Sequence, residues 1–302
     1  MRRKQRQILS RVGGVILLAM LFFTIYHNIS IQEVETNTVN QTGSMEVHFI
    51  DVGQGDAILV EADNAAMLID AGESNKSSVV TKYLDSQHIT KLDYVIGTHP
   101  HSDHIGGLNT VLNTYEINKV LLPDVIHTTK TYENVLDTIE KRNLSVTKAQ
   151  VGNLYYLGSA SFTILAPNSD NYEDMNNYSI VIRLKYGDST FLLTGDAEAL
   201  SEKEMLSSGM DLSADVLKLG HHGSAYSSCE DFLDAVKPSY AVISLGKDNE
   251  YGHPHQRTLR SIHDRNIKLY RTDLQGSIIF NTNGKTISVN KKNYEITEKD
   301  FD

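Results

Sequence analysis

One ten-residue segment of this 302-residue chain concentrates metal-ligand side chains where a helix cannot continue. Residues 98–107 read THPHSDHIGG, so three histidines and one aspartate fall within six positions. Pro100 prevents a helix through the first two histidines, which places them on a loop after the apolar run 92–97. Histidine nitrogens and carboxylate oxygens are ligands that zinc and similar divalent cations accept. The segment therefore predicts a metal site at a strand end, with the candidate ligands His99, His101, Asp103 and His104.

Short β-rich runs alternate with helical stretches from residue 45 onward. In the first half we expect strands at 46–50, 57–61, 66–69, 92–97, 118–122 and 145–148, and helices at 77–87, 108–114 and 131–142. In the second half we expect strands at 161–165, 179–186, 190–193, 214–219 and 240–244, helices at 197–207, 230–236 and 257–264, and three short strands before 290. Two mixed halves of this kind predict an α/β protein, a four-layer αββα sandwich with the ligands at one edge of its sheets.

Two further loops carry potential ligands at expected strand ends. Residues 192–196 (LLTGD) end an apolar run in Asp196, which could also be a turn-forming or helix-capping aspartate. Residues 217–224 (LKLGHHGS) place His221 and His222 between two glycines, before any helix has begun. Adjacent histidines in such a loop are poor core residues, so metal ligation is the favoured interpretation.

A third loop contains His253, which Pro254 again keeps out of a helix. With this loop included, seven of the twelve histidines lie in only three loops, each near an expected strand end. That concentration supports a shared metal centre. The other histidines stand alone and are interpreted as ordinary surface or core residues: His27, His48, His88, His127 and His263.

The N-terminal region, residues 1–29, combines a basic segment with an apolar one. Five Arg or Lys residues precede the uncharged run 12–26, which is shorter than the ~20 residues of a comfortable membrane span. We predict a single-pass signal-anchor in the cell membrane, with the basic end cytoplasmic and the rest extracytoplasmic. A secreted protein with a cleaved signal is the alternative. Polar residues 30–44 are then a flexible linker, and residues 45–302 form the folded domain.

Net charge and cysteine content restrict the substrate and the metal chemistry. The chain carries a formal charge of −10, residues 1–11 carry +5, and Glu33 and Glu35 carry −2, which leaves −13 for residues 44–302. Such an acidic domain repels duplex nucleic acid unless basic residues gather locally, and no strong basic patch is evident. Cys229 is the only cysteine, so an internal disulfide and a thiolate-ligated zinc site are both excluded.

Five motifs resemble the metallo-β-lactamase superfamily and, within it, the hydrolase domain of ComEC-type competence proteins. They are residues 51–57 (DVGQGDA), 98–107, 193–196 (LTGD), 221–224 (HHGS) and 252–254 (GHP), in the family's order. The resemblance covers nearly all of residues 45–290 and implies the αββα fold with two divalent cations, zinc first and manganese second. ComEC-type proteins carry many membrane spans whereas this chain has one candidate span, so we do not expect it to translocate DNA.

The resemblance implies six cation ligands in two sets that share one carboxylate. They are His99 and His101 for the first cation, Asp103, His104 and His221 for the second, and Asp196 between the two. His222 is expected to orient its neighbour rather than to bind a cation. Many superfamily members have another histidine before the bridging aspartate, but here only His127 lies in that interval, outside any such motif. We therefore expect the first cation to be held weakly or to be completed by water.

The same resemblance implies hydrolysis by a hydroxide generated from cation-bound water. Asp103 is expected to orient this nucleophile, and His253 to bind the substrate's phosphate or to protonate the leaving oxygen. The lower-ranked substrate contacts are His222, Ser224 and Asn177. The glycine turn behind the site is expected to be shaped by Asp51, Gln54 and Asp56, and Asp70 is interpreted in the same way.

These observations predict an extracytoplasmic metal-dependent hydrolase, of phosphodiesterase or nuclease type. Single-stranded nucleic acid and small phosphodiesters suit the acidic domain better than duplex DNA does. A lactone or carboxyl-ester hydrolase is the first alternative, because the same hydroxide attacks a carbonyl carbon. The second alternative is a binding module that has kept the metal without turnover, which the missing histidine would favour.

Overall fold

The structure is a computed structural model, and it describes residues 43–301. The expected membrane anchor, residues 1–29, and nearly all of the expected linker lie outside the described residues. Within residues 43–301, every helix is too short or too polar to span a bilayer.

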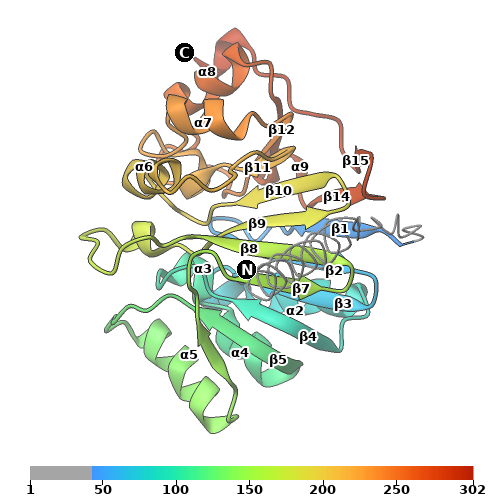
Figure 1. Ribbon diagram of the computed structural model, residues 1–302, viewed down its shortest axis with the longest axis vertical. Helices are drawn as coiled ribbons and strands as arrows, with labels where there is room; N and C mark the ends of the chain where they lie inside the picture. The colour runs from blue at the N-terminus through green and yellow to red at the C-terminus, as the bar shows by residue number, and fades with distance from the viewer. Residues whose placement is uncertain (1–42, 302) are drawn as a thin grey trace, which may run out of the picture. The chain divides into compact units, whose positions relative to one another are not determined.

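Two β-sheets build the described domain (Figure 1). The first sheet has the strand order β15-β14-β1-β2-β3-β4-β5-β6 and the second β13-β12-β11-β10-β9-β8-β7. The first contains β1 (Met45–Phe49), β2 (Ile58–Ala62), β3 (Ala65–Ile69), β4 (Lys91–Ile96), β5 (Glu116–Leu122), β6 (Val146–Lys148), β14 (Ile278–Thr282) and β15 (Ile287–Val289). The second contains β7 (Leu154–Leu157), β8 (Ala160–Ala166), β9 (Val181–Tyr186), β10 (Ser189–Leu193), β11 (Val216–Lys218), β12 (Tyr240–Ile243) and β13 (Lys268–Arg271).

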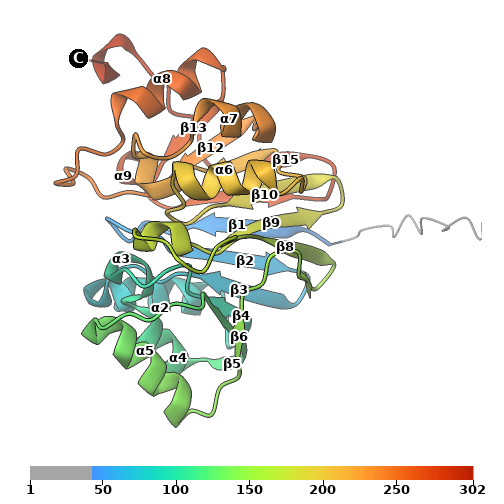
Figure 2. The ribbon, with the colours of Figure 1, turned by 60° about the vertical axis from the view of Figure 1, so that its left-hand side comes forward.

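Helices cover the outer face of each sheet, which confirms the predicted αββα layering (Figure 2). The first sheet packs against α2 (Ser77–Ser86), α4 (Leu108–Thr114) and α5 (Lys130–Lys141). The second packs against α6 (Ala199–Ser207), α7 (Glu230–Val236) and α8 (Gln256–Asp264). The remaining helical segments are α3 (Ser102–Ile105), α9 (Thr272–Gln275) and the 3-10 turns η1 (Ser74–Lys76), η2 (Met175–Tyr178), η3 (Gly220–Gly223) and η4 (Glu298–Asp300).

Strand β1 shows how the sequence pattern produces these layers. Met45, Val47 and Phe49 are fully buried in the core between the two sheets. Successive side chains of a strand point to opposite faces, so Glu46 and His48 lie on the face that α2 covers. Burial of a side chain such as Phe49 contributes about 1.5–3 kcal/mol, and it fixes which face of the strand looks inward.

The expected elements are observed to within a few residues, with two informative differences. Strand β7 is not predicted, because Leu154 and Tyr156 are exposed and the strand lies at the edge of its sheet. Helix α6 begins at Ala199 rather than at 197, because the preceding residues form a loop instead of the first helical turn. In β7 the position at the sheet edge, and before α6 the loop, determine the local structure instead of the hydrophobic pattern.

Parallel pairing gathers several loops at one edge of the domain. Strands β3 to β6 run parallel in the first sheet, and β10 to β13 run parallel in the second. Loops that follow the carboxyl ends of such strands meet at the same edge, where α/β proteins generally bind ligands. The loops after β3, β4, β10 and β11 carry Asp70, His99, Asp196 and His221 respectively.

Candidate metal centre

Asp70 orients the histidine at the middle of the site. Its backbone has a φ of 57°, which is left-handed, and its buried carboxylate accepts three hydrogen bonds. The donors are Thr98 N at 2.8 Å, Thr98 Oγ1 at 2.6 Å and His104 Nδ1 at 2.7 Å. Because Nδ1 of His104 is held in this way, Nε2 is the nitrogen left to face Asp196. A carboxylate behind a histidine is a common support for a metal ligand.

The glycines of the sequence motifs let the loops around this histidine approach one another. At Gly55, where φ is 115°, an added Cβ would lie 2.0 Å from the carbonyl oxygen of Asp103. At Gly107 an added Cβ would lie 2.3 Å from the carbonyl oxygen of Ala71. These glycines therefore allow contact between backbone segments beside the site.

Four residues form a tight cluster in front of Asp70, and their ligand atoms all lie within 4.8 Å of one another. Nε2 of His104 lies 3.1 Å from Oδ2 of Asp196, and Nε2 of His222 lies 3.3 Å from that same oxygen. Nε2 of His222 is also 3.3 Å from Oδ2 of Asp103. Two imidazoles and two carboxylates at this spacing form a donor set that suits one divalent cation.

A second pair of donors adjoins this cluster. Nε2 of His99 lies 3.0 Å from Nδ1 of His101 and 3.9 Å from Oδ2 of Asp196. The other ring nitrogen of His99 is within 3.1 Å of Oγ1 of Thr98 and 3.4 Å of Oγ of Ser179, which hold the ring in place. Asp196 therefore lies between the two histidine groups, as a shared carboxylate would.

His222, rather than His221, belongs to the four-residue cluster, and this reverses the preference drawn from the sequence. His222 is buried, and its Nδ1 donates to the carbonyl oxygen of Ser244 at 2.8 Å. His221 instead has Nδ1 2.9 Å from Oε1 of Glu198, and its Nε2 lies 4.0 Å from Oδ2 of Asp196. Two consecutive left-handed residues, with φ values of 45° and 52°, turn these neighbouring side chains in different directions. Non-glycine residues in that region cost about 1–3 kcal/mol each and cluster at functional sites.

Without a cation, protons on the histidines compensate the carboxylates. Burial lowers the pKa of His222, but Asp196, Asp103 and Asp56 together outweigh burial and raise that pKa to about 9. Burial also opposes the charge of His104, yet Asp196 and Asp70 hold its pKa well above the ordinary value. Burial raises the pKa of Asp103, but His104 and His222 lower it overall. Cation binding at this cluster is therefore expected to release protons.

A buried lysine behind the cluster supplies a permanent positive charge. Nζ of Lys218 lies 2.7 Å from Oδ2 of Asp56 and 3.8 Å from Oδ1 of Asp196, and it donates to the carbonyl oxygen of Gly195 at 2.9 Å. All three charged side chains are almost completely buried. Asp56 thus acts as the partner of Lys218 in addition to its place in the glycine turn. The sequence motifs do not predict a role for Lys218, because a lysine within a strand does not match any pattern of metal ligands.

A cavity of about 720 Å³ opens over the cluster and brings in residues from separate loops. His101, Asp103, Asp196, His221, His222 and His253 all line it. His127 lines it too, although the sequence led us to interpret it as an ordinary surface or core residue, as do Thr129, Asp174, Asn176 and Tyr251, to which the sequence assigned no role. Among the described residues that line this cavity there is no lysine or arginine. Positive charge at its wall therefore comes from protonated histidines such as His222 or from bound cations.

His253 lies in this cavity, as expected for a residue that meets substrate. Its ring stacks against Tyr251 at a centroid distance of 5.8 Å and lies 5.2 Å from His221. Burial lowers the pKa of His253 to about 4, and the neighbouring histidines add to that effect. Its Nδ1 is buried without a hydrogen bond in the described structure, so it is free to meet a ligand. The catalytic role of His253 remains a prediction.

Asn177 and Ser224 lie outside this cavity, in contrast to the expected substrate contacts. Oδ1 of Asn177 accepts from the backbone N–H groups of Glu198 and Ser201, at the start of α6. Oγ of Ser224 accepts from the backbone N–H of Tyr226 at 3.2 Å. Both side chains are buried, so they hold local backbone in place instead of facing a substrate.

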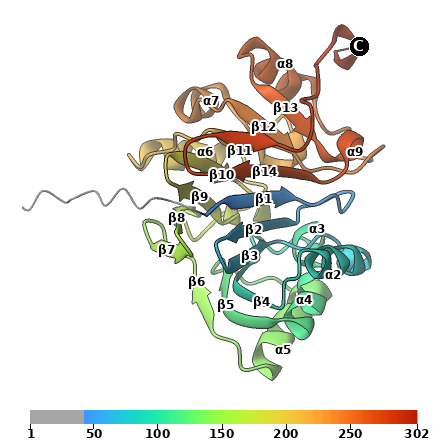
Figure 3. The same cartoon turned by 90° about the vertical axis from the view of Figure 1, so that its right-hand side faces the viewer.

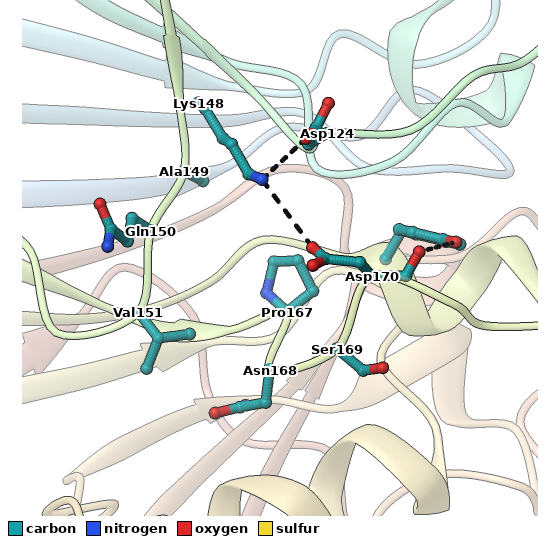
Figure 4. Close-up of a pocket in the computed structure, with 10 residues that line it drawn as sticks. Asp124, Lys148, Ala149, Gln150, Val151, Pro167, Asn168, Ser169 and Asp170 are labelled. Atoms are coloured by element: carbon teal, nitrogen blue, oxygen red, sulfur yellow. Dashed lines mark hydrogen bonds and ion pairs between the residues drawn. The ribbon is translucent and has the colours of Figure 1, made fainter.

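A second cavity, of about 420 Å³, lies beside the loop that follows β8 (Figure 4). Lys148 is the basic residue of its wall, and Nζ lies 2.7 Å from Oδ2 of Asp124 and 3.8 Å from Oδ1 of Asp170. This lysine is already flanked by two carboxylates, so the second cavity offers little attraction for an anion. The first cavity, with its ligand cluster, is therefore the candidate functional site.

Comparison with known proteins agrees with this geometry. Residues 50–165 match the sequence model of the metallo-beta-lactamase superfamily. The chain belongs to this superfamily. The resemblance to metallo-β-lactamase proteins, which the His99–His104 motif indicated, is thus confirmed.

Several of the curated relatives are competence proteins, as the motifs predict. ComE operon protein 3 of Bacillus subtilis is 30% identical over 284 residues, covering 88% of this chain and 35% of the relative. Competence protein ComA of Neisseria gonorrhoeae is 32% identical over 233 residues, covering 76% of this chain and 31% of the relative. The chain spans about a third of the length of the curated relatives that it matches.

A solved structure supports the fold alone. The metallo-beta-lactamase fold protein YhfI of Bacillus subtilis superposes with a TM-score of 0.51 at 15% identity, covering 72% of this chain and 93% of that one. The shared fold therefore extends well beyond residues 50–165.

The residues of this metallo-β-lactamase site fit a pair of divalent cations. Oδ1 of Asp196 is buried without a hydrogen bond in the described structure. His104 and His222 each use Nδ1 for a protein acceptor and direct Nε2 toward Asp196. This donor set leaves the metal's identity open, since zinc and manganese both accept imidazole and carboxylate.

Proposed function

We propose that this protein is an extracytoplasmic metal-dependent phosphodiesterase that uses two divalent cations. One observation carries the proposal: the ligand atoms of Asp103, His104, Asp196 and His222 lie within 4.8 Å of one another, and all of these residues except His104 line a cavity of about 720 Å³. When bound there, the cations lower the pKa of water to about 7 and polarise a phosphoryl or carbonyl oxygen. In this assignment His222 replaces His221 as a ligand of the second cation, and His99 and His101 serve the first.

The chain's own residues position the reactants. Asp103 is partly exposed, with 23% of its side chain accessible, and it lies beside His222, so one carboxylate oxygen can accept a hydrogen bond from the attacking water and orient it. His253 faces the same space from another loop; because its pKa is lowered to about 4, the ring is neutral near pH 7, and we assign it to binding the substrate's non-bridging oxygen rather than to protonating the leaving oxygen. Nδ2 of Asn176 donates to Oε1 of Glu198 at 3.3 Å and lies 3.2 Å from Nδ1 of His221, so Asn176 holds these two side chains in position at the rim of the cavity.

The absence of basic residues from the cavity wall favours a small or single-stranded phosphodiester. With no lysine or arginine among the described lining residues, the cations alone attract the phosphate. Duplex DNA needs several lysine or arginine contacts to its backbone for tight binding, and residues 44–302 carry a charge of −13. We therefore propose extended single strands or isolated phosphodiesters as substrates, with exposed Tyr251 available for stacking at the rim.

The proposed location follows from the N-terminal sequence. The basic segment and the apolar run 12–26 support a signal-anchor, with the catalytic domain outside the cytoplasm. Fractionation of cells that express the full chain, combined with protease treatment of intact cells, tests this proposal. Protection of the domain in intact cells would contradict it.

A substrate panel tests the proposed activity. The full chain is assayed with zinc or manganese on a chromogenic phosphodiester, single-stranded DNA and a lactone. Variants Asp196→Ala and His222→Ala are compared with Ser102→Ala, which alters the same cavity wall at a residue that donates only to Glu73.

We expect phosphodiester turnover in the wild type and in Ser102→Ala. The two ligand variants should lose more than about 100-fold of this activity, since substitutions of residues that only support a metal ligand already cost about 10–100-fold in metal affinity or activity. Turnover that survives in Asp196→Ala would refute the mechanism. Turnover of the lactone alone would assign an ester hydrolase instead, and none on any substrate would favour the binding module.

A further inference from the structure

A second group of ligand-type side chains lies outside the cavity, on the outer face of the β1–β2 pair. Glu46 and Glu61 are directly opposite each other across these antiparallel strands, and His48 is two positions along β1 on the same face. Figure 3 shows β1 between β14 and β2 in the first sheet. The ligand atoms of these three residues lie within 4.8 Å of one another, and none of the three lines the metallo-β-lactamase cavity.

The geometry around the His48 nitrogen is that of a ligand set rather than of a hydrogen bond. Nε2 lies 3.2 Å from Oε2 of Glu46 and 3.5 Å from Oε1 of Glu61. Although both oxygens are close, neither makes a hydrogen bond with this buried nitrogen. A tetrahedral zinc ion about 2.0–2.2 Å from each donor would separate the donor atoms by about 3.3–3.5 Å, with the oxygens off the axis of the ring nitrogen. The observed spacing fits that arrangement.

The surroundings hold the imidazole in place. Its other nitrogen, Nδ1, lies 3.0 Å from the hydroxyl of Tyr83 on α2, and the two rings pack edge to face. The side chain of His48 is fully buried, so its ring cannot turn toward solvent. A second hydrogen bond of this kind commonly fixes the tautomer and orientation of a metal-binding histidine.

The two carboxylates lack a cationic partner from the protein. Among the described residues, no lysine or arginine forms an ion pair with Glu46 or Glu61, and Asn281 is a neutral donor to Oε1 of Glu46 at 2.6 Å. Like charges directly opposite in a sheet destabilise the strand pair. Burial raises the pKa of Glu61, and the nearby Glu46 raises it further. A bound cation would remove this repulsion.

Solvent reaches the group through Glu61. Its side chain is 28% exposed, and it lines a cavity of about 250 Å³ that also includes Gln87 and His88. An ion can therefore enter without opening the sheet, and water can fill the remaining coordination position.

We propose that Glu46, His48 and Glu61 form a separate site for one divalent transition-metal cation, which joins β1 to β2. One imidazole and two carboxylates are a donor set of the zinc type, with manganese as a weaker competitor. The site supplies a cross-strand link that is independent of the proposed hydrolysis.

Zinc content tests this site in the full-length protein. The wild type, Asp196→Ala, and each combined with Glu61→Gln are stripped of metal, equilibrated with zinc and measured by mass spectrometry. Glu116→Gln, an exposed change on β5 of the same sheet, is the matched control. Comparing each variant with its own parent keeps the result independent of the cations in the metallo-β-lactamase cavity.

We expect Glu61→Gln to remove about one zinc equivalent in both backgrounds, and Glu116→Gln to remove none. Zinc is also expected to raise the Tm of Asp196→Ala, and this rise should be absent when Glu61→Gln is added, although the metal-free double variant remains folded. Glu46→Gln should behave in the same way. Equal zinc content and an equal rise in Tm with and without Glu61→Gln would overturn the proposal and leave the group as a proton-sharing pair of carboxylates around His48.

Discussion

Replacement of Lys218 by methionine tests whether the site depends on a built-in positive charge. Lys218 is fully buried, and Nζ lies 2.7 Å from Oδ2 of Asp56, which is itself 1% exposed. Removing one member of such a pair leaves an uncompensated buried carboxylate and costs about 3–5 kcal/mol. In a domain of this size each kcal/mol lowers Tm by about 2–4 °C, so Lys218→Met should lower Tm of the metal-free protein by about 6–20 °C. Thermal unfolding followed by circular dichroism, repeated in urea, measures the change.

Two controls separate lost charge from lost packing. Asp56→Asn combined with Lys218→Met removes both charges and should recover most of the lost stability, because no unpaired ion remains. Lys203→Met, on the exposed face of α6, should change stability by less than about 0.5 kcal/mol. The reasoning is refuted if Lys218→Met costs less than about 1 kcal/mol, or if the double variant is as unstable as the single one.

Three further results are expected. His222→Ala should lower zinc affinity at least about 10-fold more than His221→Ala does, because only His222 joins the four-residue cluster. Isothermal titration calorimetry measures both affinities, and the opposite order would restore His221 as the ligand. Although burial opposes the charge, Asp196, Asp103 and Asp56 raise the pKa of His222 to about 9 from an ordinary 6.5. The protonated ring therefore stabilises the metal-free protein fully below pH 6.5, and this stabilisation is lost as the pH rises through 9. His222→Asn should flatten that part of a stability–pH curve, and an unchanged curve would exclude the charged interaction. Glu202→Ala should lower the free energy of unfolding by about 2–4 kcal/mol, because it leaves the N–H groups of Ser228 and Cys229 without their acceptor. Urea unfolding measures this change, and a loss below about 1 kcal/mol would show that water replaces the carboxylate as acceptor.

The layered fold was accessible from sequence because hydrophobic periodicity is strong in most elements. The run 190–193 is buried on both faces, and it is recognisable as a strand without any tertiary information. The edge strand β7 is the exception, since its exposed leucine and tyrosine dilute the pattern. Motif loops with glycine and proline marked the strand ends equally well, which is why the site could be placed at one edge of the sheets.

The choice between His221 and His222 could not be made from sequence. The two residues are adjacent and chemically identical, and only the left-handed backbone at both positions decides which ring faces Asp196. Asn177 and Ser224 were similarly ambiguous, because a polar side chain near a motif can serve the backbone as readily as a substrate. Their hydrogen bonds to backbone N–H groups decide in favour of the backbone.

Contacts between residues distant in sequence also could not be predicted. Lys218 meets Asp56 across 162 positions only because β11 of one sheet faces the glycine turn of the other. His48 was interpreted as an ordinary residue because neither Glu46 nor Glu61 forms a recognised spacing with it. Strand register brings these three together, and register follows from the turns and core packing of the whole sheet.

A manganese-soaked crystal of the protein, with anomalous scattering measured above the manganese edge, tests the central claim most directly. Two peaks about 3.5–4 Å apart should flank Asp196, one bounded by His99 and His101 and the other by Asp103, His104 and His222. The absence of any peak within bonding distance of Asp196 at saturating manganese would contradict the account.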